Sequence, residues 1–134
     1  MQTFLPLPSF SESAAVLDRR RLGKQRVEAL QIIRALTVPG AGWRNHPAAK
    51  MWDGYVPALA AYGVAVCDVW ISLGYKDTCR SRFLDLADPS ASRPPWFGRE
   101  DFHLAHRSNL IRKDPEYYGQ RWPEVPNDLP YLWG

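Results

Sequence analysis

Residues 18–31 of this chain read DRRRLGKQRVEALQ and combine dense positive charge with a helical pattern. From this stretch onward, apolar side chains recur every three residues, at Val27, Leu30, Ile33 and Leu36. This spacing predicts an apolar stripe along one side of a helix that ends at Pro39-Gly40. We expect Gly23 to loosen the helix without ending it.

The segment that precedes the helix has a different character. Pro6 and Pro8 disfavour a helix in residues 1–8, which we expect to run as an extended arm. Ser9 is followed three residues later by Glu12, in the form of a capping box. The predicted helix therefore begins near Ser9.

Two further long helices and one short helix are predicted downstream. In the first, one face carries Leu59, Tyr62, Val66, Val69 and Leu73. Pro57 marks a kink or a fresh start of this helix, and Gly74 suits its end. A short helix is expected after Asp77, followed by a proline-rich connection over residues 88–98. The second long helix is expected over residues 100–113.

The remaining pattern sets the fold class. The tail that follows Asp114-Pro115 is rich in aromatic residues and proline, so we expect an irregular strap against the body. No segment has the alternation of a strand, and 134 residues suffice for one domain. We therefore predict an all-α fold, a single-domain helical bundle over residues 1–134, with an extended N-terminal arm and an irregular aromatic tail.

The bulk composition restricts the class of protein. The net charge is only +3, but residues 19–26 hold five basic side chains and no acid, a density that suits phosphate binding. Cys67 and Cys79 lack the spacing of a redox or zinc motif. No signal peptide or membrane span is predicted. We expect a soluble, cytoplasmic, nucleoid-associated protein that uses no cofactor.

One helix face in the basic stretch could carry chemistry. Arg21, Lys24, Gln25, Glu28 and Gln31 share this face through spacings of three and four residues. One interpretation is a solvated surface with an ordinary ion pair between Lys24 and Glu28. The other is a catalytic surface, on which the cations hold a phosphate backbone and Glu28 faces a sugar that gains positive charge.

The three histidines allow several roles. His46 stands beside Arg44 and Asn45, and can either cap a helix or contact a nucleotide. His103 and His106 form an HxxH pair that could share a metal, but a complete site needs a third ligand. A metal-dependent hydrolase built from all three histidines is therefore one alternative.

The tail region intermixes aromatic and basic side chains. The aromatic residues are Tyr117, Tyr118, Trp122, Tyr131 and Trp133, and the basic ones are Arg112, Lys113 and Arg121. Such a mixture can stack on unpaired nucleobases, while in a small protein the same residues commonly seal the core.

Three segments, LGKQRVEAL, GWRNHP and HRSNLIRKDPEYYG, resemble in this order the pyrimidine-dimer DNA glycosylase family, whose phage members are called endonuclease V. The resemblance implies a compact all-α domain that binds DNA, everts a nucleotide, cleaves a glycosidic bond and then cleaves the strand at the abasic site. It also implies that the α-amine of Met1 is the nucleophile and that Glu28 is the key acid.

The chain departs from the family pattern at two positions. Phage members expose a threonine after removal of the initiator methionine, but the larger Gln2 predicts that Met1 is retained. Val27 stands where the phage pattern has an arginine, so we expect other bases to take over its phosphate contacts. The predicted DNA-binding residues are Arg20, Arg21, Lys24, Arg26, Arg44, Asn45, His46, Arg107, Arg112, Lys113, Tyr117 and Tyr118.

The sequence thus predicts a base-excision DNA repair enzyme, a DNA glycosylase with an associated abasic-site lyase. It would act on a damaged or modified pyrimidine, its partner would be double-stranded DNA with an everted nucleotide, and we expect a monomer to suffice. The main alternative is a nucleic-acid-binding module without catalytic activity, whose binding would be salt-dependent but would not need Glu28.

Overall fold

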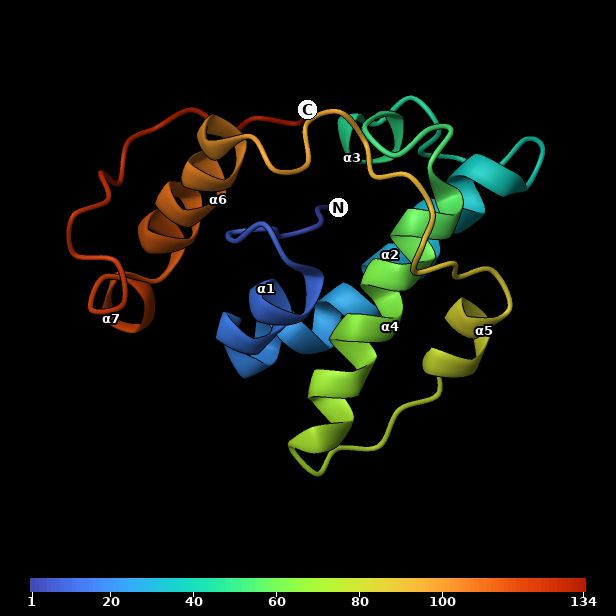
Figure 1. Ribbon diagram of the computed structural model, residues 1–134, viewed down its shortest axis with the longest axis horizontal. Helices are drawn as coiled ribbons and strands as arrows, with labels where there is room; N and C mark the ends of the chain where they lie inside the picture. Colours follow the sequence, from blue (N-terminus) through green and yellow to red (C-terminus); the bar gives the residue numbers. More distant parts are fainter.

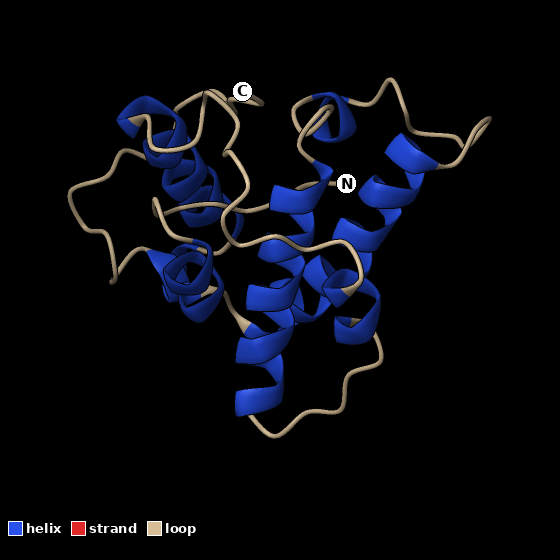
Figure 2. Ribbon diagram, turned by 45° about the vertical axis from the view of Figure 1, so that its right-hand side comes forward, coloured by secondary structure: helices blue, strands red, loops and turns tan.

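The computed structural model describes residues 1–134 as helices and loops without any strand (Figures 1 and 2). This confirms the predicted all-α fold. The helices are α1 (Phe10–Val16), α2 (Arg19–Thr37), α3 (Pro47–Lys50), α4 (Val56–Ser72), α5 (Arg80–Leu84), α6 (Glu100–Lys113) and α7 (Pro115–Tyr118). None of them is long and apolar enough to span a membrane.

The first predicted helix is divided in two. Ser9 caps α1 as expected, because its side chain accepts a hydrogen bond from the amide of Glu12. However, Leu17 and Asp18 have extended backbones, and the Asp18 side chain accepts from the amide of Arg21 to begin α2. The prediction of one continuous helix was wrong here because Asp18 acts as an N-cap.

The buried face of α2 differs from the predicted stripe. Val27 is 47% exposed, whereas the buried residues are Leu22, Gln25, Ala29, Ile32, Ile33 and Ala35. A strict spacing of three falls short of the helical repeat, so Val27 and Leu36 are about 2.5 turns apart and face opposite directions. The stripe was therefore wrong at Val27, and the supposedly exposed Gln25 lies in the core.

Helices α2 and α4 cross closely in the centre of the molecule (Figure 1). The fresh start predicted at Pro57 is confirmed, since this residue lies in the first turn of α4. Gly23 does not loosen α2. A Cβ atom at this position would lie 3.1 Å from the Trp70 ring of α4, so glycine permits the close approach. Leu73, predicted to be on the buried face of α4, is 57% exposed.

The C-terminal part follows the prediction except where the tail begins. The predicted irregular tail starts with the short helix α7, because the Asp114 side chain caps it by accepting from the amide of Tyr117. Helix α6 has the expected bounds, and beyond α7 the tail contains no helix. Trp122 stacks on buried Tyr118 with ring centroids 5.7 Å apart. The Arg112 guanidinium donates to the carbonyl oxygens of Asn127 and Leu129. The tail is thus a strap that α6 fastens to the body.

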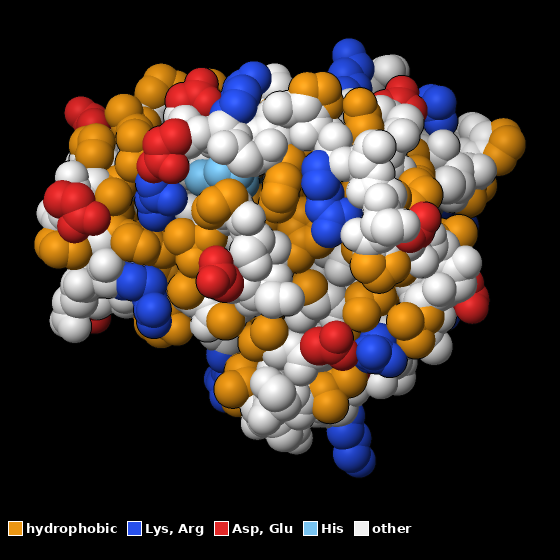
Figure 3. Space-filling view, viewed as in Figure 1, with side chains coloured by type: hydrophobic (Ala, Val, Ile, Leu, Met, Phe, Trp, Pro, Cys, Tyr) orange, Lys and Arg blue, Asp and Glu red, His pale blue; other side chains and the backbone are white.

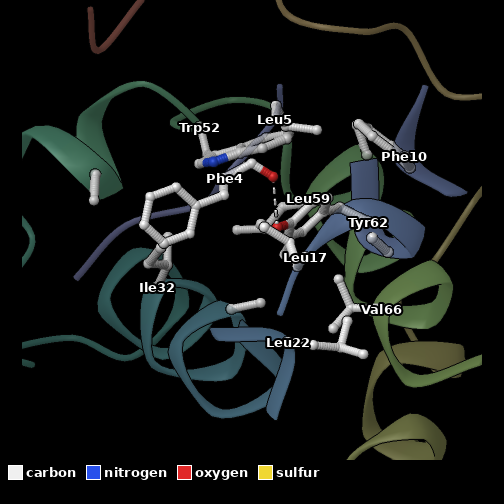
Figure 4. Packing of buried hydrophobic residues seen from close by; sticks show 14 of the residues in the cluster. Phe4, Leu5, Phe10, Leu17, Leu22, Ile32, Trp52, Leu59, Tyr62 and Val66 are labelled. Carbon is white, nitrogen blue, oxygen red and sulfur yellow. Dashed lines mark hydrogen bonds between the residues drawn. The ribbon is translucent and has the colours of Figure 1, made fainter. Parts of the chain in front are cut away.

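The N-terminal arm passes through the middle of the molecule, between α6 and the crossed pair α2 and α4 (Figure 1). Thr3, Phe4 and Leu5 are buried, and the close view in Figure 4 shows Phe4 and Leu5 among core side chains of α2 and α4. An N-terminal segment of this kind is normally exposed. Here it forms part of the hydrophobic core.

Candidate active site

The buried side chain of Gln25 pairs with the arm as a neighbouring strand would. Its Nε2 donates to the carbonyl oxygen of Gln2 over 3.1 Å, and its Oε1 accepts from the amide of Phe4 over 2.9 Å. One amide side chain thereby satisfies main-chain groups on two residues of the arm. This explains why a polar residue lies on the buried face of α2.

Two aromatic residues complete the hydrogen bonds to Thr3 and Phe4. The Tyr62 hydroxyl lies 3.0 Å from the carbonyl oxygen of Phe4 and 2.7 Å from Gln25 Oε1, and the first contact is dashed in Figure 4. Burial, first of all, raises the pKa of Tyr62 well above its usual value, so its hydroxyl keeps its proton to donate. Trp52 donates its indole N–H to the hydroxyl of Thr3 over 3.0 Å.

Two histidines of α6 hold both main-chain groups of Leu5. Nε2 of His103 accepts from the amide of Gly98 over 2.9 Å, so Nδ1 carries the proton and donates to the Leu5 carbonyl over 2.7 Å. Nδ1 of His106 accepts from the Leu5 amide over 3.0 Å. The remaining nitrogen, Nε2, donates to the carbonyl oxygen of Leu132 in the tail.

The protonation state of these two histidines fits their hydrogen bonds to the arm. Burial lowers the pKa of His106 to about 3, and burial likewise lowers the pKa of His103. Both rings are therefore neutral at physiological pH, as acceptance of a hydrogen bond by one ring nitrogen requires. The pair is a neutral clamp on the arm.

The clamp also bears on the metal alternative. All four ring nitrogens of His103 and His106 are already bound to protein groups. His46 uses its Nδ1 to accept from the amide of Ala48 at the start of α3, which confirms the capping interpretation. The hydrolase alternative therefore loses two of the three ligands on which it depended.

Further contacts extend the clamp beyond Leu5. Arg107 donates to the carbonyl oxygen of Pro6 over 2.8 Å, and the Ser13 hydroxyl exchanges hydrogen bonds with both main-chain groups of Leu7. Side chains thus hold the arm from Gln2 to Leu7. The arm has no neighbouring strand to pair with. Side chains of the folded body therefore satisfy its main-chain groups and fix its course.

Glu28 lies where this arm begins. Its Oε2 accepts from the amide of Gln2 over 3.1 Å and from Nε2 of Gln25 over 3.2 Å, whereas Oε1 receives no hydrogen bond from the protein. Only two backbone atoms separate the Gln2 nitrogen from the α-amine of Met1, so the amine lies within about 7 Å of the carboxylate. An amine and an oriented carboxylate are thereby brought together.

The C-terminal tail also reaches this place. The Tyr131 ring packs on His106 with centroids 4.7 Å apart, and its buried hydroxyl has no hydrogen-bond partner. Burial raises the pKa of Tyr131, and the negative charge of Glu28 raises it further. The hydroxyl is thus a neutral donor in the electrostatic neighbourhood of Glu28.

A groove follows the exposed side of α2 and contains Glu28 near its middle. Its central hollow shares Arg20 and Lys24 with a hollow at the start of the helix, and shares Gln31 with one at its end. We call these three neighbouring hollows together the α2 groove. In the view of Figure 1, α4 lies in front of α2. Figure 3 shows the surface from this same side, and it mixes acidic and basic side chains.

The first hollow of the α2 groove gathers four predicted DNA-binding residues. They are Arg20, Arg21, Lys24 and Lys113. Arg21 forms an ion pair with Asp18 over 3.1 Å, while the other three form no ion pair. In particular, Lys24 does not pair with Glu28, so the expected ordinary surface pair is absent.

Other predicted DNA-binding residues are engaged within the protein. Arg26 pairs with Asp77 and lies over the Trp70 ring, and Arg107 pairs with Glu100 besides holding Pro6. Arg112 fastens the tail. Tyr118 is buried, and its hydroxyl bonds to Asp18. The side chains of these four residues thus already have structural partners, and their contact with DNA stays a prediction.

The remaining predicted residues lie on the surface. Tyr117 is 42% exposed at α7, next to the first hollow of the groove. Arg44 and Asn45 are exposed in the loop that follows α2, where Arg44 donates to the carbonyl oxygen of Leu36. Their side of the molecule adjoins the far end of the α2 groove through Trp43.

Sequence reasoning missed the residues that hold the arm. The buried register Leu22, Gln25, Ala29 and Ile32, with steps of three and four, could have revealed that Gln25 points inward. The HxxH spacing did show that His103 and His106 share a face of α6. It carried no sign that their partners are the main chain of a segment some hundred residues earlier.

One of three comparisons with known proteins found a match. A family model described as pyrimidine dimer DNA glycosylase matches residues 1–82, which include the arm, Gln25 and Glu28. Comparisons with curated proteins and with solved structures returned no match. Since the family match covers more than half of the 134 residues, the chain belongs to the pyrimidine dimer DNA glycosylase family.

Proposed function

We propose that the chain removes a damaged or modified pyrimidine from double-stranded DNA and then cleaves the strand at the abasic site through an imine on the α-amine of Met1. The observation that carries this proposal is the hydrogen bond from the Gln2 amide to Glu28. It holds the first residues of the arm against a carboxylate that lies in a groove with unpaired cations.

The α-amine suits the proposed nucleophile. A primary amine can attack an electrophilic carbon and form an imine, as lysine amines do in Schiff-base enzymes. The amine would attack C1′ of an everted nucleotide, and the bond to the base breaks with its electron pair passing to the base. Opening of the sugar ring at O4′ then gives the imine between C1′ and the protein.

Glu28 would act on charge and protons in these steps. The carboxylate would stabilise positive charge on the sugar as the base departs, and its Oε1 has no protein donor to compete for it. Loss of a C2′ proton from the imine then permits β-elimination, in which the bond from C3′ to the 3′ phosphate oxygen breaks. Strand incision thus follows base release without a metal or cofactor.

The cations of the α2 groove would hold the phosphate backbone. Arg20, Lys24 and Lys113 form no ion pair, so binding a phosphate would not require them to release a protein partner. The amine, the carboxylate and these cations belong to one chain, so we expect a monomer to act alone.

The test is incubation of the untagged protein with a duplex that carries one cyclobutane pyrimidine dimer. The cleaved base stays joined to its neighbour through the cyclobutane ring, so photochemical reversal of the dimer is used to free it. Base release and strand incision are then measured separately, with an undamaged duplex as control. We expect both products from the damaged duplex and neither from the control. Salt-dependent binding without base release would instead favour the binding module, and base release without incision would remove the imine step.

A further inference from the structure

Two cations of α2 and two aromatic rings meet beside the central hollow of the α2 groove, which Arg19 and Trp70 both line. The Tyr75 ring stacks on the Trp70 ring with centroids 4.4 Å apart and planes inclined by 28°. The guanidinium of Arg26 lies over Trp70, 4.5 Å from the ring centroid, and that of Arg19 lies over Tyr75 at 6.0 Å. We call these four residues the aromatic stack.

The aromatic stack is fixed by the loop that joins α4 to α5 (Figure 1). Trp70, in the last turn of α4, donates its indole N–H to the carbonyl oxygen of Lys76 in this loop over 2.8 Å. Asp77, in the same loop, forms an ion pair with Arg26 of α2. The loop is thereby tied to both helices, and Tyr75 is held against Trp70 although it is 36% exposed.

Arg19 brings an unpaired charge to the central hollow. It is exposed and forms no ion pair. Arg19 and Glu28 are nine positions apart, about 2.5 turns of helix, so their side chains leave α2 in opposite directions and border the hollow on opposite sides. The hollow also contains Arg20 and Lys24, and Glu28 is its only acid. The side across from the carboxylate is therefore cationic.

We propose that Arg19 binds a phosphate of the DNA backbone and that Tyr75 is a positioning residue that orients the guanidinium for this contact. The inference rests on the proposed function, because it assigns a further residue of the same groove to the DNA substrate. An arginine already held over a ring loses less side-chain freedom on binding, and its planar fork suits phosphate oxygens. Its place across the hollow from Glu28 suits the backbone and not the reacting sugar.

The experiment measures the affinity of the full chain, over a salt series, for a duplex with a tetrahydrofuran abasic analogue. Arg19→Ala should weaken binding and reduce the slope of log affinity against log salt by about 0.9, the loss of one phosphate contact. Tyr75→Leu should weaken binding by about threefold without changing the slope, because Arg19 keeps its charge but is no longer oriented. Tyr75→Phe retains the ring and should restore wild-type affinity.

A double variant distinguishes positioning from a general structural effect. Tyr75→Leu in the Arg19→Ala background should cause no further loss of affinity, because the ring acts through the guanidinium. Arg82→Ala removes an exposed cation of α5 that forms no ion pair and is the matched control for charge. An unchanged slope in Arg19→Ala, or an equal loss from Tyr75→Leu with and without Arg19, would overturn the proposal.

The proposed function is tested in parallel by borohydride trapping of the wild type on a true abasic site. Failure to form a trapped complex would refute the lyase mechanism, while the salt slopes would still decide the role of Arg19. A wild type that is trapped, together with an Arg19→Ala variant whose affinity and slope equal those of the wild type, would refute only the role of Arg19.

Discussion

The amide of Gln2 and Oε2 of Glu28 are joined by a hydrogen bond of 3.1 Å, between residues that are 26 positions apart in the sequence. Gln25 strengthens this link because its side chain bonds to Glu28 and to the Gln2 carbonyl. The carboxylate is therefore oriented by the segment whose amine it is proposed to assist. Positioning of this kind is a large part of enzymatic rate enhancement.

Glu28→Gln should abolish most base release while preserving binding. The glutamine retains an oxygen that can accept from the Gln2 amide, so the arm should stay in place, but it cannot supply negative charge. We expect single-turnover base release to fall by about 100-fold or more. The affinity for an abasic duplex should change little, and wild-type turnover by the variant would remove Glu28 from the mechanism.

Gln25→Leu should loosen the arm. The substitution leaves the Phe4 amide and the Gln2 carbonyl without partners in the core, which destabilises the protein by about 2–4 kcal/mol in urea unfolding. Imine trapping should slow more than DNA binding weakens, because the amine is no longer fixed. Gln120→Leu makes the same change at an exposed position without such hydrogen bonds, and equal stability loss in both variants would contradict this account.

Stability should fall on mild acidification because of the histidine clamp. The folded pKa of His106 is about 3, below its usual value of 6.5, so the unfolded chain takes up the proton first. The contribution of His106 is complete above about pH 7 and is lost as the pH falls towards 3. Between about pH 7 and pH 5 this loss amounts to about 2 kcal/mol.

The effect of the histidines on stability can be distinguished from that of the carboxylates, because the two effects are lost in different pH ranges. The pKa values of Asp18 and Asp77 lie below their usual value of 3.8, so their stabilisation is lost only in stronger acid. Urea unfolding across the window should show a shallower pH dependence for His106→Gln, which does not titrate. Constant wild-type stability between about pH 7 and pH 5 would show that the histidines are not held neutral.

The salt dependence of DNA binding tests the α2 groove. If Arg20 and Lys24 each neutralise one phosphate, replacing both by alanine should reduce the slope of log affinity against log salt by about 1.8. Arg82→Ala removes an exposed charge of α5 that forms no ion pair and should leave the slope unchanged. An equal effect of Arg82→Ala would indicate a general effect of net charge.

The parts of the fold that were predictable depend on local sequence signals. Helix α6 has its predicted bounds because the pattern is helical from Glu100 and Asp114-Pro115 ends it. The start of α4 at Pro57 likewise follows from proline in a first helical turn. The break at Asp18 was missed for two reasons. The capping box at Ser9 already supplied a helix start, and the sequence is helical in pattern on both sides of Asp18, so nothing local indicated that Asp18 is a second N-cap.

The candidate site was predictable only in part, since its contacts are distant in sequence. Glu28 and the cations Arg20, Lys24 and Lys113 were identified from their types and from the family resemblance, and they line the α2 groove. The histidine clamp joins residues about a hundred positions apart, which no spacing rule reveals. Burial shows that Tyr118 seals the core, and burial depends on the tertiary fold.

The most direct test of the central claim is borohydride trapping on a duplex with one abasic site. Reduction converts an imine into a permanent bond, and mass spectrometry of the digested complex identifies the modified residue. We predict a crosslink on the α-amine of Met1, lost when this amine is acetylated and greatly slowed in Gln25→Leu. A crosslink on a lysine side chain, or none while DNA binding persists, would contradict the account.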